Sequence, residues 1–439
     1  MKNFVKLFSW VGGVIGIILM AYFISTGIGN QSFMLKEDDS QKVYFADHIS
    51  PAHKAVIDAF NIKYKGRIEV VAVDLPFTKF STNERKELLA RSLRSKSNRL
   101  DIFSVDYIWT SRFAKWCEVL DPYFGEYAQT KIISPTIQSC ITDGKIVAMP
   151  LYIDIGMMYY RKDIIQRLPN GDEIERKLKK SITWDEFLSL RSKLGYNNRP
   201  YYIFQANDYE GLICNYFEIA KSLDSNFFAY NTINLKSPAA KKALQILVDF
   251  VHKQKISPLK VVEFDENQSY QYMLENDAVF VRGWPNFVEN FQKTYPNDPR
   301  FQYIERAPLP HFPGMKPTSV YGGWNLMISK FSTKKEAAVE FIRFLQTKET
   351  QKMMFELGGY IPVNHDIYSD TAYLAQHPDL VFYRKLVENG FHRPSLEEYT
   401  KLSDIIAHFV HLAIKGEMTA DEALQRATEM IGSKNVLIK

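Results

Sequence analysis

Length, composition and charge limit the classes of protein to which this chain can belong. It has 439 residues, of which 46% are hydrophobic and 24% charged, a composition typical of a soluble globular protein rather than a disordered one. The net charge of +5 is the small difference between 55 basic and 50 acidic side chains, which argues against nucleic-acid binding. The chain is too long for one ordinary core, so we expect two domains.

The N-terminus departs from this soluble pattern. Lys2 and Lys6 precede a run without charged residues that extends from residue 7 to residue 35. Its most apolar part, residues 7–28, can span a bilayer as a helix, and the two lysines place everything after it outside the cytoplasm. We therefore expect residues 1–35 to be a signal or transmembrane anchor segment, with residues 7–28 spanning a membrane. A secretory signal cleaved near Gly27 or Gly29 is the alternative, and both interpretations export the folded part from the cytoplasm.

The next segments alternate between strand-like and helix-like patterns. Residues 42–46, 68–73 and 101–105 are short and rich in β-branched or aromatic residues, whereas residues 51–65 and 84–93 are amphipathic. This alternation predicts a mostly parallel sheet with helices on its faces.

Several later helices have recognisable ends. A capping box, in which a hydroxyl and a carboxylate three residues later satisfy two free amides, predicts helix starts at Thr183, Thr333, Ser395 and Thr419. Ser237 followed by Pro238 predicts another start, and Gly358 and Gly416 predict helix ends.

Three cysteines, Cys117, Cys140 and Cys214, lie in the exported part. An odd number leaves at least one thiol unpaired, and a Cys117–Cys140 disulfide and three buried thiols both remain open. No CxxC or Cys/His cluster indicates a metal. His408 and His411 lie on one predicted helix and could bind a metal only with a third ligand from elsewhere, so we expect neither a metal nor a cofactor.

The stretch from residue 144 to residue 163, GKIVAMPLYIDIGMMYYRKD, is the most informative part of the chain. It contains two apolar strand-like pieces that we expect to meet at Pro150, because proline disturbs a sheet ladder and favours a bend between two bodies. Asp154 lies among apolar neighbours, where a carboxylate without a polar partner is costly. It is either a surface residue on an edge strand or a ligand-facing acceptor between two domains, where small-molecule sites commonly lie.

Motifs for common enzyme chemistry are absent. The sequence has no phosphate-binding loop, no nucleophile elbow and no paired zinc histidines, and we expect no catalytic residues. A glycoside hydrolase that uses Asp154 and Glu210 as its two carboxylates is the enzymatic alternative. The residues that stand out are aromatic or acidic and lie beside Gly, Pro or Asn, where ligand contacts are common. They are Asp106, Trp109, Asp154, Tyr209, Glu210, Trp284, Trp324 and Asn325.

An ordered set of segments resembles a known family. In chain order they include DIFSVDYIW, WCEVLDPYF, DGKIVAMPLYIDIGMMYYRKD, TWDEF, QANDYEGLICNYFE, MLENDAVFVRGWP, APLPHFPG, YGGWNLMISKFSTKKEAAVEFIRFL, LGGYIPVNHDIY and RPSLEEYTKLSDIIAHFVHLAIKGEMTADEAL. From about residue 43 to about residue 432, the chain resembles the family 1 extracellular solute-binding proteins of bacterial ABC sugar importers, the maltose/trehalose-type group. It lacks the lipid-accepting cysteine that many Gram-positive relatives carry after the apolar run.

This resemblance implies an α/β, bilobed periplasmic-binding-protein fold of type II, with two discontinuous lobes joined by a three-segment hinge. The first lobe would contain residues 42–150 and 309–356, and the second residues 151–308 and 357–432. The passages between lobes would lie near residues 149–154, 306–310 and 357–362.

The resemblance also implies a function without catalysis. A monomer would bind a sugar, an α-linked disaccharide or small oligosaccharide, between its lobes and deliver it to an ABC permease in the cytoplasmic membrane. A membrane-tethered sugar sensor is the alternative. Asp154 would accept hydrogen bonds from sugar hydroxyls, and Tyr209 and Glu210 would contact the sugar from the second lobe. The remaining implied ligand-binding residues are the stacking rings Trp284 and Trp324, the close-approach glycines Gly322 and Gly323, and Asp106 and Tyr399.

Overall fold

The computed structural model describes residues 40–76, 79–80, 82–196 and 199–433. The predicted signal or anchor segment, residues 1–35, lies outside these ranges. Within them, none of the helices combines the length and the apolar character that crossing a bilayer requires.

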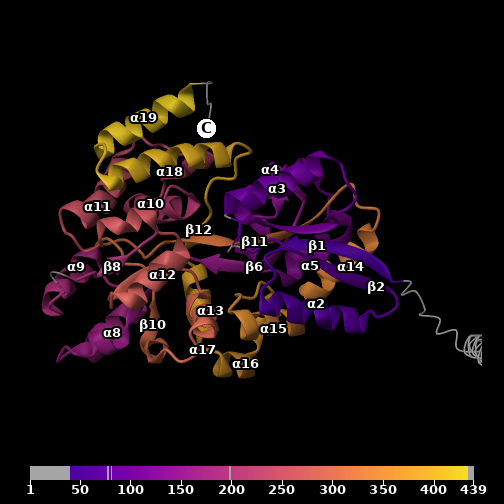
Figure 1. Cartoon of the computed structure of the whole chain (residues 1–439), viewed down its shortest axis with the longest axis horizontal. Coiled ribbons are helices and arrows are strands. Elements are labelled where there is room, and N and C mark those ends of the chain that lie inside the picture. The colour runs from indigo at the N-terminus through magenta and orange to yellow at the C-terminus, as the bar shows by residue number, and fades with distance from the viewer. Residues whose placement is uncertain (1–39, 77–78, 81, 197–198, 434–439) are drawn as a thin grey trace, which may run out of the picture.

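Two β-sheets organise the described chain into two lobes (Figure 1). The first sheet has the strand order β12-β11-β3-β1-β2, and β6 also pairs with β11. Strands β1, β2 and β3 are parallel, as the alternating pattern predicts, whereas β11 runs antiparallel to β3 and β6. The strands are β1 (Gln41–Asp47), β2 (Ile68–Asp74), β3 (Ile102–Asp106), β6 (Met149–Ile155), β11 (Ser319–Ile328) and β12 (Gly390–Phe391).

Helices lie above and below this sheet, as expected where parallel strands are joined by helical connections (Figure 1). The first of them starts at a Ser50 cap followed by Pro51, and it buries Val56, Ile57 and Phe60 against the sheet. The helices of this lobe are α2 (Pro51–Lys63), α3 (Thr82–Arg94), α4 (Thr110–Phe113), α5 (Asp121–Lys131), α6 (Ser134–Gln138), α14 (Lys335–Leu345) and α15 (Lys348–Gly358). A short hairpin, β4 (Ile141–Thr142) and β5 (Lys145–Ile146), precedes β6.

The second sheet has the order β10-β7-β9-β8. It consists of β7 (Met157–Arg161), β8 (Tyr202–Ile203), β9 (Phe280–Gly283) and β10 (Ile304–Ala307). Its helices are α7 (Lys162–Ile165), α8 (Gly171–Lys180), α9 (Trp184–Lys193), α10 (Glu210–Leu223), α11 (Pro238–His252), α12 (Glu266–Glu275) and α13 (Phe287–Thr294). The C-terminal helices α18 (Tyr399–Lys415) and α19 (Ala420–Gly432) pack on α10 and α11, and α16 (Thr371–Gln376) and α17 (Pro378–Val387) lie between the lobes (Figure 1).

The first passage between the sheets lies at Gly156, and the expected meeting of two strands at Pro150 is wrong. Strand β6 continues through Pro150, whose effect on the ladder is a bulge: Tyr152 pairs with Trp324 and Pro150 with Asn325. A Cβ atom at Gly156 would lie 1.8 Å from Glu218 Oε1. Glycine is therefore required where the chain leaves one sheet for the other.

Strand pairing also bears on the other two passages. His311 forms a bridge with Thr183 of the second lobe, and β11 begins at Ser319 in the first sheet. Ile361 and Asn364 form bridges with residues of the first lobe, at Ile153 and Ile132 respectively. On these pairings we propose passages at residue 156, within residues 312–318 and beyond residue 364, and the lobe boundaries remain a prediction.

The predicted helix ends are confirmed in part. Thr183, Ser237 and Thr419 cap helix starts, and Gly416 adopts the left-handed conformation after α18. The predicted start at Thr333 is wrong, since α14 begins at Lys335 without a side-chain cap. The start at Ser395 is also wrong, because α18 begins at Tyr399. Gly358 is the last residue of α15, and the left-handed cap is Gly359.

All three cysteines are buried free thiols. Burial raises the pKa of Cys117, Cys140 and Cys214, and the thiolate is the reactive form. We therefore expect no fast reaction with Ellman's reagent in the native protein and three reacting thiols per chain in denaturant. Fewer than three thiols in denaturant would instead indicate a disulfide.

Candidate functional site

Three of the predicted site residues meet beside the first passage. Asp154 near the end of β6 pairs in register with Gly322 of β11. A Cβ atom at Gly322 would lie 3.0 Å from the ring of Trp284 and 3.3 Å from Asp154 Cβ. Trp284 follows β9 of the second sheet, so this contact joins residues of the two lobes. The missing side chain at Gly322 leaves room for both the indole of Trp284 and the side chain of Asp154 beside β11.

The Asp154 carboxyl group has an oxygen without a hydrogen-bond partner among the described residues. The residue is 9% exposed, and that oxygen, Oδ1, is buried. Burial, and then the nearby Asp106 carboxylate, raises the pKa of Asp154 to about 7, whereas the Arg282 guanidinium opposes the rise. A buried acceptor without a partner is costly unless a ligand supplies a donor.

Each lobe contributes a tryptophan covered by a buried arginine. The Arg282 Cζ atom lies 4.0 Å from the centre of the Trp284 ring, and the Arg85 Cζ atom lies 4.3 Å from the Trp324 ring. These are cation–π distances. Trp284 is partly buried and Trp324 is 8% exposed.

A buried carboxylate holds each of these arginines in place. Arg282 donates to both Glu218 oxygens, at 2.9 and 3.1 Å, and Arg85 donates to Asp47 Oδ1 at 2.9 Å. Because both guanidinium groups are fully buried, the paired charges fix the orientation of the indoles above them.

Arg393 joins three further predicted residues into a second cluster. It donates to Glu210 Oε1 at 2.7 Å and to Asp106 Oδ1 at 3.3 Å, so it links the end of β3 to the start of α10. Glu210 also accepts hydrogen bonds from Tyr399, at 2.8 Å, and from Ser403. Burial raises the pKa of Asp106, and Arg393 opposes that rise. The predicted acceptors Asp106 and Glu210 are therefore largely satisfied by the protein itself.

Tyr209 lies at the start of α10 beside Glu266 of α12. Its burial and the Glu266 carboxylate together raise the pKa of the Tyr209 hydroxyl. Glu266 also accepts a hydrogen bond from Trp284 Nε1 at 3.2 Å. Tyr209 is thus connected to the junction through Glu266 and the indole.

Gly323 has a backbone role in the same strand. Its φ of +125° is rarely adopted by other residues, and a Cβ atom there would lie 2.5 Å from the Tyr152 carbonyl oxygen. We expect Gly323→Ala to lower the free energy of unfolding by about 1–3 kcal/mol from backbone strain alone. Denaturant unfolding tests this. Gly125→Ala is the matched control, because Gly125 lies in α5 with open space around it and its replacement should stabilise the helix by about 0.5–1 kcal/mol.

The three buried arginines of this region were not identified from the sequence. Arg85 and Arg393 lie in charged or loop-like segments that favour solvent exposure, and Arg282 lies in the apolar segment AVFVRG, where a charged residue more often marks a solvent-facing strand position. No local signal marks Arg282 either, because Trp284, the aromatic ring that it covers, lies beyond the end of β9 and outside the strand alternation.

The two histidines considered as metal ligands do not form a site. His408 Nδ1 lies 2.9 Å from Asp208 Oδ2 and His411 Nδ1 lies 2.9 Å from the Ala206 carbonyl oxygen. Across the described ranges, no group of three potential metal ligands comes together.

Comparison with known proteins assigns the chain to a family. The model for bacterial extracellular solute-binding proteins matches residues 45–352, which is more than half of the chain. The chain belongs to this family. The resemblance seen in the sequence is thereby confirmed.

The similarity of this solute-binding protein to known relatives extends over most of their length. A probable ABC transporter-binding protein of Deinococcus radiodurans is 25% identical over 356 residues, covering 78% of this chain and 82% of the relative. The maltose-bound MalE3 structure of T. maritima has a TM-score of 0.79 at 27% identity, covering 89% of this chain and 99% of that one. An ABC transporter solute-binding protein from Thermotoga lettingae, bound to α-D-tagatose, has a TM-score of 0.74 at 21% identity, covering 89% and 98%. The solute-binding protein thus has the predicted α/β, bilobed periplasmic-binding-protein fold of type II, with two discontinuous lobes and a three-segment hinge.

Proposed function

We propose that this solute-binding protein captures a sugar between its lobes and delivers it to the permease of an ABC importer, without altering it chemically. The observation that carries the proposal is the buried Oδ1 of Asp154, which has no partner among the described residues, on a side chain that shares the space above Gly322 with the Trp284 indole. The Deinococcus radiodurans relative and the Thermotoga lettingae protein are both described as binding proteins of ABC transporters, which supports the importer role.

The chemistry of the junction suits a pyranose. A sugar ring carries hydroxyl donors at its rim and apolar C–H patches on its faces. A carboxylate accepts charge-assisted hydrogen bonds from the rim, and an indole covers a face. Since Arg282 lies over one face of the partly exposed Trp284, we expect the opposite face to meet the sugar.

The proposed residue roles fall into two groups. Asp154, Trp284 and Trp324 contact the sugar, and Gly322 and Gly323 allow the close approach of β11. Asp106, Glu210 and Tyr399 mainly hold Arg393, since Glu210 already accepts three hydrogen bonds from the protein. Tyr209 positions Glu266 and, through it, Trp284. These three hydrogen bonds to Glu210 also argue against the hydrolase alternative, because a catalytic carboxylate must be free to reach the substrate.

For the sugar itself we propose an α-linked disaccharide or small oligosaccharide, as the maltose-bound relative suggests. Micromolar binding corresponds to about −8 kcal/mol. A few hydrogen bonds to charged groups, at about 1.5–3 kcal/mol each, together with stacking, can supply this after ordering costs.

Titration calorimetry against maltose, trehalose, sucrose and tagatose tests the proposal. We expect micromolar affinity for at least one α-linked disaccharide. Thermal shift provides a second readout, because ligand at 100 times its dissociation constant adds about 2.7 kcal/mol to the stability of the folded state. Absence of binding to any saccharide would contradict the proposed ligand class.

We also propose that the monomer is held at the inner membrane by residues 7–28 and faces the periplasm. Mass spectrometry of the N-terminus of the protein isolated from cells decides between an anchor and a cleaved signal. An N-terminus near residue 30 would contradict the anchor.

A further inference from the structure

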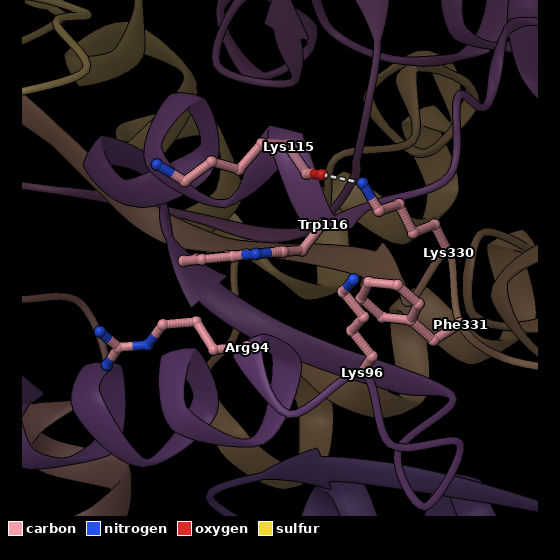
Figure 2. A pocket seen from close by; sticks show the side chains of 6 residues that line it. All are labelled: Arg94, Lys96, Lys115, Trp116, Lys330 and Phe331. Atoms are coloured by element: carbon pink, nitrogen blue, oxygen red, sulfur yellow. Dashed lines mark hydrogen bonds between the residues drawn. The ribbon is translucent and has the colours of Figure 1, made fainter.

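A basic pocket lies in the first lobe, at the end of the sheet opposite the proposed sugar site. It is an open hollow of about 430 Å³, lined by Arg94, Lys96, Lys115, Trp116, Lys330 and Phe331. In Figure 2 the Trp116 ring lies edge-on between the side chains of Lys115 and Arg94, and Lys96 and Lys330 stand beside Phe331. Four cationic groups thus surround two aromatic rings, and no carboxylate is among the lining residues.

Backbone pairing fixes the position of the pocket. The Lys330 amide donates to the Trp116 carbonyl at 3.0 Å, just beyond the end of β11, and Lys96 lies just before β3. Ile328 at that end of β11 pairs with Ile102, whereas Trp324 pairs with Asp106 at the other end. The pocket and the sugar site are therefore separated by the length of β3, roughly 16 Å at the usual rise per residue.

The charges of the pocket are only weakly neutralised. Arg94 lies 3.5 Å from Glu87, and Lys115 lies 3.3 Å from Glu397, and all four side chains are at least half exposed. Exposed ion pairs of this kind contribute little and exchange readily. The Lys115 ammonium also lies 5.1 Å from the centre of the Trp116 ring. The pocket therefore suits a ligand that has an anionic group for the lysines and arginine and an apolar part for the two aromatic rings.

The N-terminal segment enters the first lobe at the same end of the sheet. Strand β1 runs parallel to β3, and Phe45 pairs with Ile102, so Gln41 lies on the pocket side of that pair. Only the twelve residues from Gly29 to Ser40 separate β1 from the proposed anchor. Fully extended, they span about 40 Å, so this end of the lobe is held near the bilayer.

We infer that this pocket binds the phosphate-bearing headgroups of anionic phospholipids. Lysine and arginine donate charge-assisted hydrogen bonds to phosphate, and tryptophan favours the bilayer interface. The inference rests on the anchor proposed above, which supplies the bilayer within reach. The pocket then keeps the first lobe against the membrane while the sugar site, at the other end of the sheet, stays accessible.

Lysine labelling in nanodiscs tests the inference with the full-length protein. The labelling rate of each lysine with an amine-reactive reagent is measured by mass spectrometry in phosphatidylcholine discs with and without phosphatidylglycerol. We expect Lys96, Lys115 and Lys330 to react about fivefold more slowly when phosphatidylglycerol is present, the factor for one lysine at an anionic surface. Lys193 on α9, in the other lobe, should react at the same rate in both discs (Figure 1). Equal rates at the pocket lysines in the two kinds of disc would overturn the inference.

Charge reversal provides the matched comparison. Lys96→Glu combined with Lys330→Glu should abolish the protection of Lys115, whereas Lys193→Glu combined with Lys236→Glu, which changes the net charge equally in the second lobe, should preserve it. Protection that persists in the first double variant would overturn the inference. Protection produced by inorganic phosphate in pure phosphatidylcholine discs would assign the pocket to a free anion and overturn the lipid assignment.

The inference and the anchor fail in distinguishable ways. Loss of the protein from the discs during size-exclusion chromatography contradicts the anchor alone. The released protein is then floated with phosphatidylglycerol or phosphatidylcholine vesicles at low salt. Flotation with phosphatidylglycerol only would support headgroup binding, and no flotation would overturn it.

Discussion

Replacing Arg393 with methionine is expected to lower the free energy of unfolding by about 3–5 kcal/mol. The substitution keeps most of the side-chain volume but leaves the carboxylates of Asp106 and Glu210 without their shared cation. Because the Arg393 side chain is only 2% exposed, water cannot take its place without rearranging the junction. Removing one partner of the ion cluster has this large effect because the remaining carboxylates, 18% exposed at Asp106 and 16% at Glu210, are mostly shielded from water.

Urea unfolding followed by circular dichroism measures this change. Arg426→Met is the control, because Arg426 pairs with Glu422 on the exposed face of α19 and its loss should cost only about 0.5 kcal/mol. Arg393→Met combined with Glu210→Gln should recover part of the loss, since one of the two stranded charges is then removed. Equal, small effects of Arg393→Met and Arg426→Met would show that the cluster is not a stabilising element.

Replacing Asp154 with asparagine is expected to weaken sugar binding by about 1.5–3 kcal/mol. The amide keeps the shape of the carboxyl group but accepts weaker hydrogen bonds from sugar hydroxyls. Titration calorimetry with the disaccharide that binds best measures the loss. Unchanged affinity would show that Asp154 faces the junction without contacting the ligand.

The same substitution should change the pH dependence of stability in a defined direction. The pKa of Asp154 is about 7 in the folded protein and is raised from an ordinary value of 3.8. Below pH 4 both the folded and the unfolded state carry the proton. As the pH rises from about 4 to about 7, the unfolded state releases the proton first, and stability is lost. Asp154→Asn should therefore be increasingly more stable than the unsubstituted protein across this window, and a constant difference would contradict the assignment.

Sugar binding should show the complementary effect. Hydroxyl donors favour the ionised carboxylate, so binding should strengthen between pH 6 and pH 8 and release a proton near neutrality. Calorimetry in two buffers of different ionisation enthalpy detects that proton. Its persistence in Asp154→Asn would identify another group as the source.

Local patterns predicted the parallel part of the first sheet well, because alternating strands and helices produce that architecture directly. Strands at residues 42–46 and 68–73 and the helix between them were found because apolar periodicity and a proline at the helix start are local signals. The caps at Thr333 and Ser395 were predicted wrongly, since the helices begin at Lys335 and Tyr399. A short capping motif offers about 1 kcal/mol, which packing can override.

The site was predictable only in its apolar and acidic members. Asp154 and Trp284 stand out because a carboxylate among apolar residues and a tryptophan after glycine are locally unusual. No local pattern indicates that Arg85, Arg282 or Arg393 is buried, because burial there depends on carboxylates distant in the sequence. Pro150 is the more conspicuous residue in the sequence, yet the chain passes between the sheets at Gly156, where no side chain would fit.

The ion pair beside Gly156 ties two of the connecting strands to one carboxylate. Glu218 Oε1 accepts from Arg282 and, at 3.3 Å, from the Val320 amide, and the Gly156 amide donates to the Val320 carbonyl at 3.0 Å. The proposed first connection and the start of β11, which follows the proposed second connection, therefore cannot twist independently without breaking buried hydrogen bonds. The lobes should consequently pivot about a single axis near these residues, so that relaxation-dispersion measurements on both connections would report one common exchange rate.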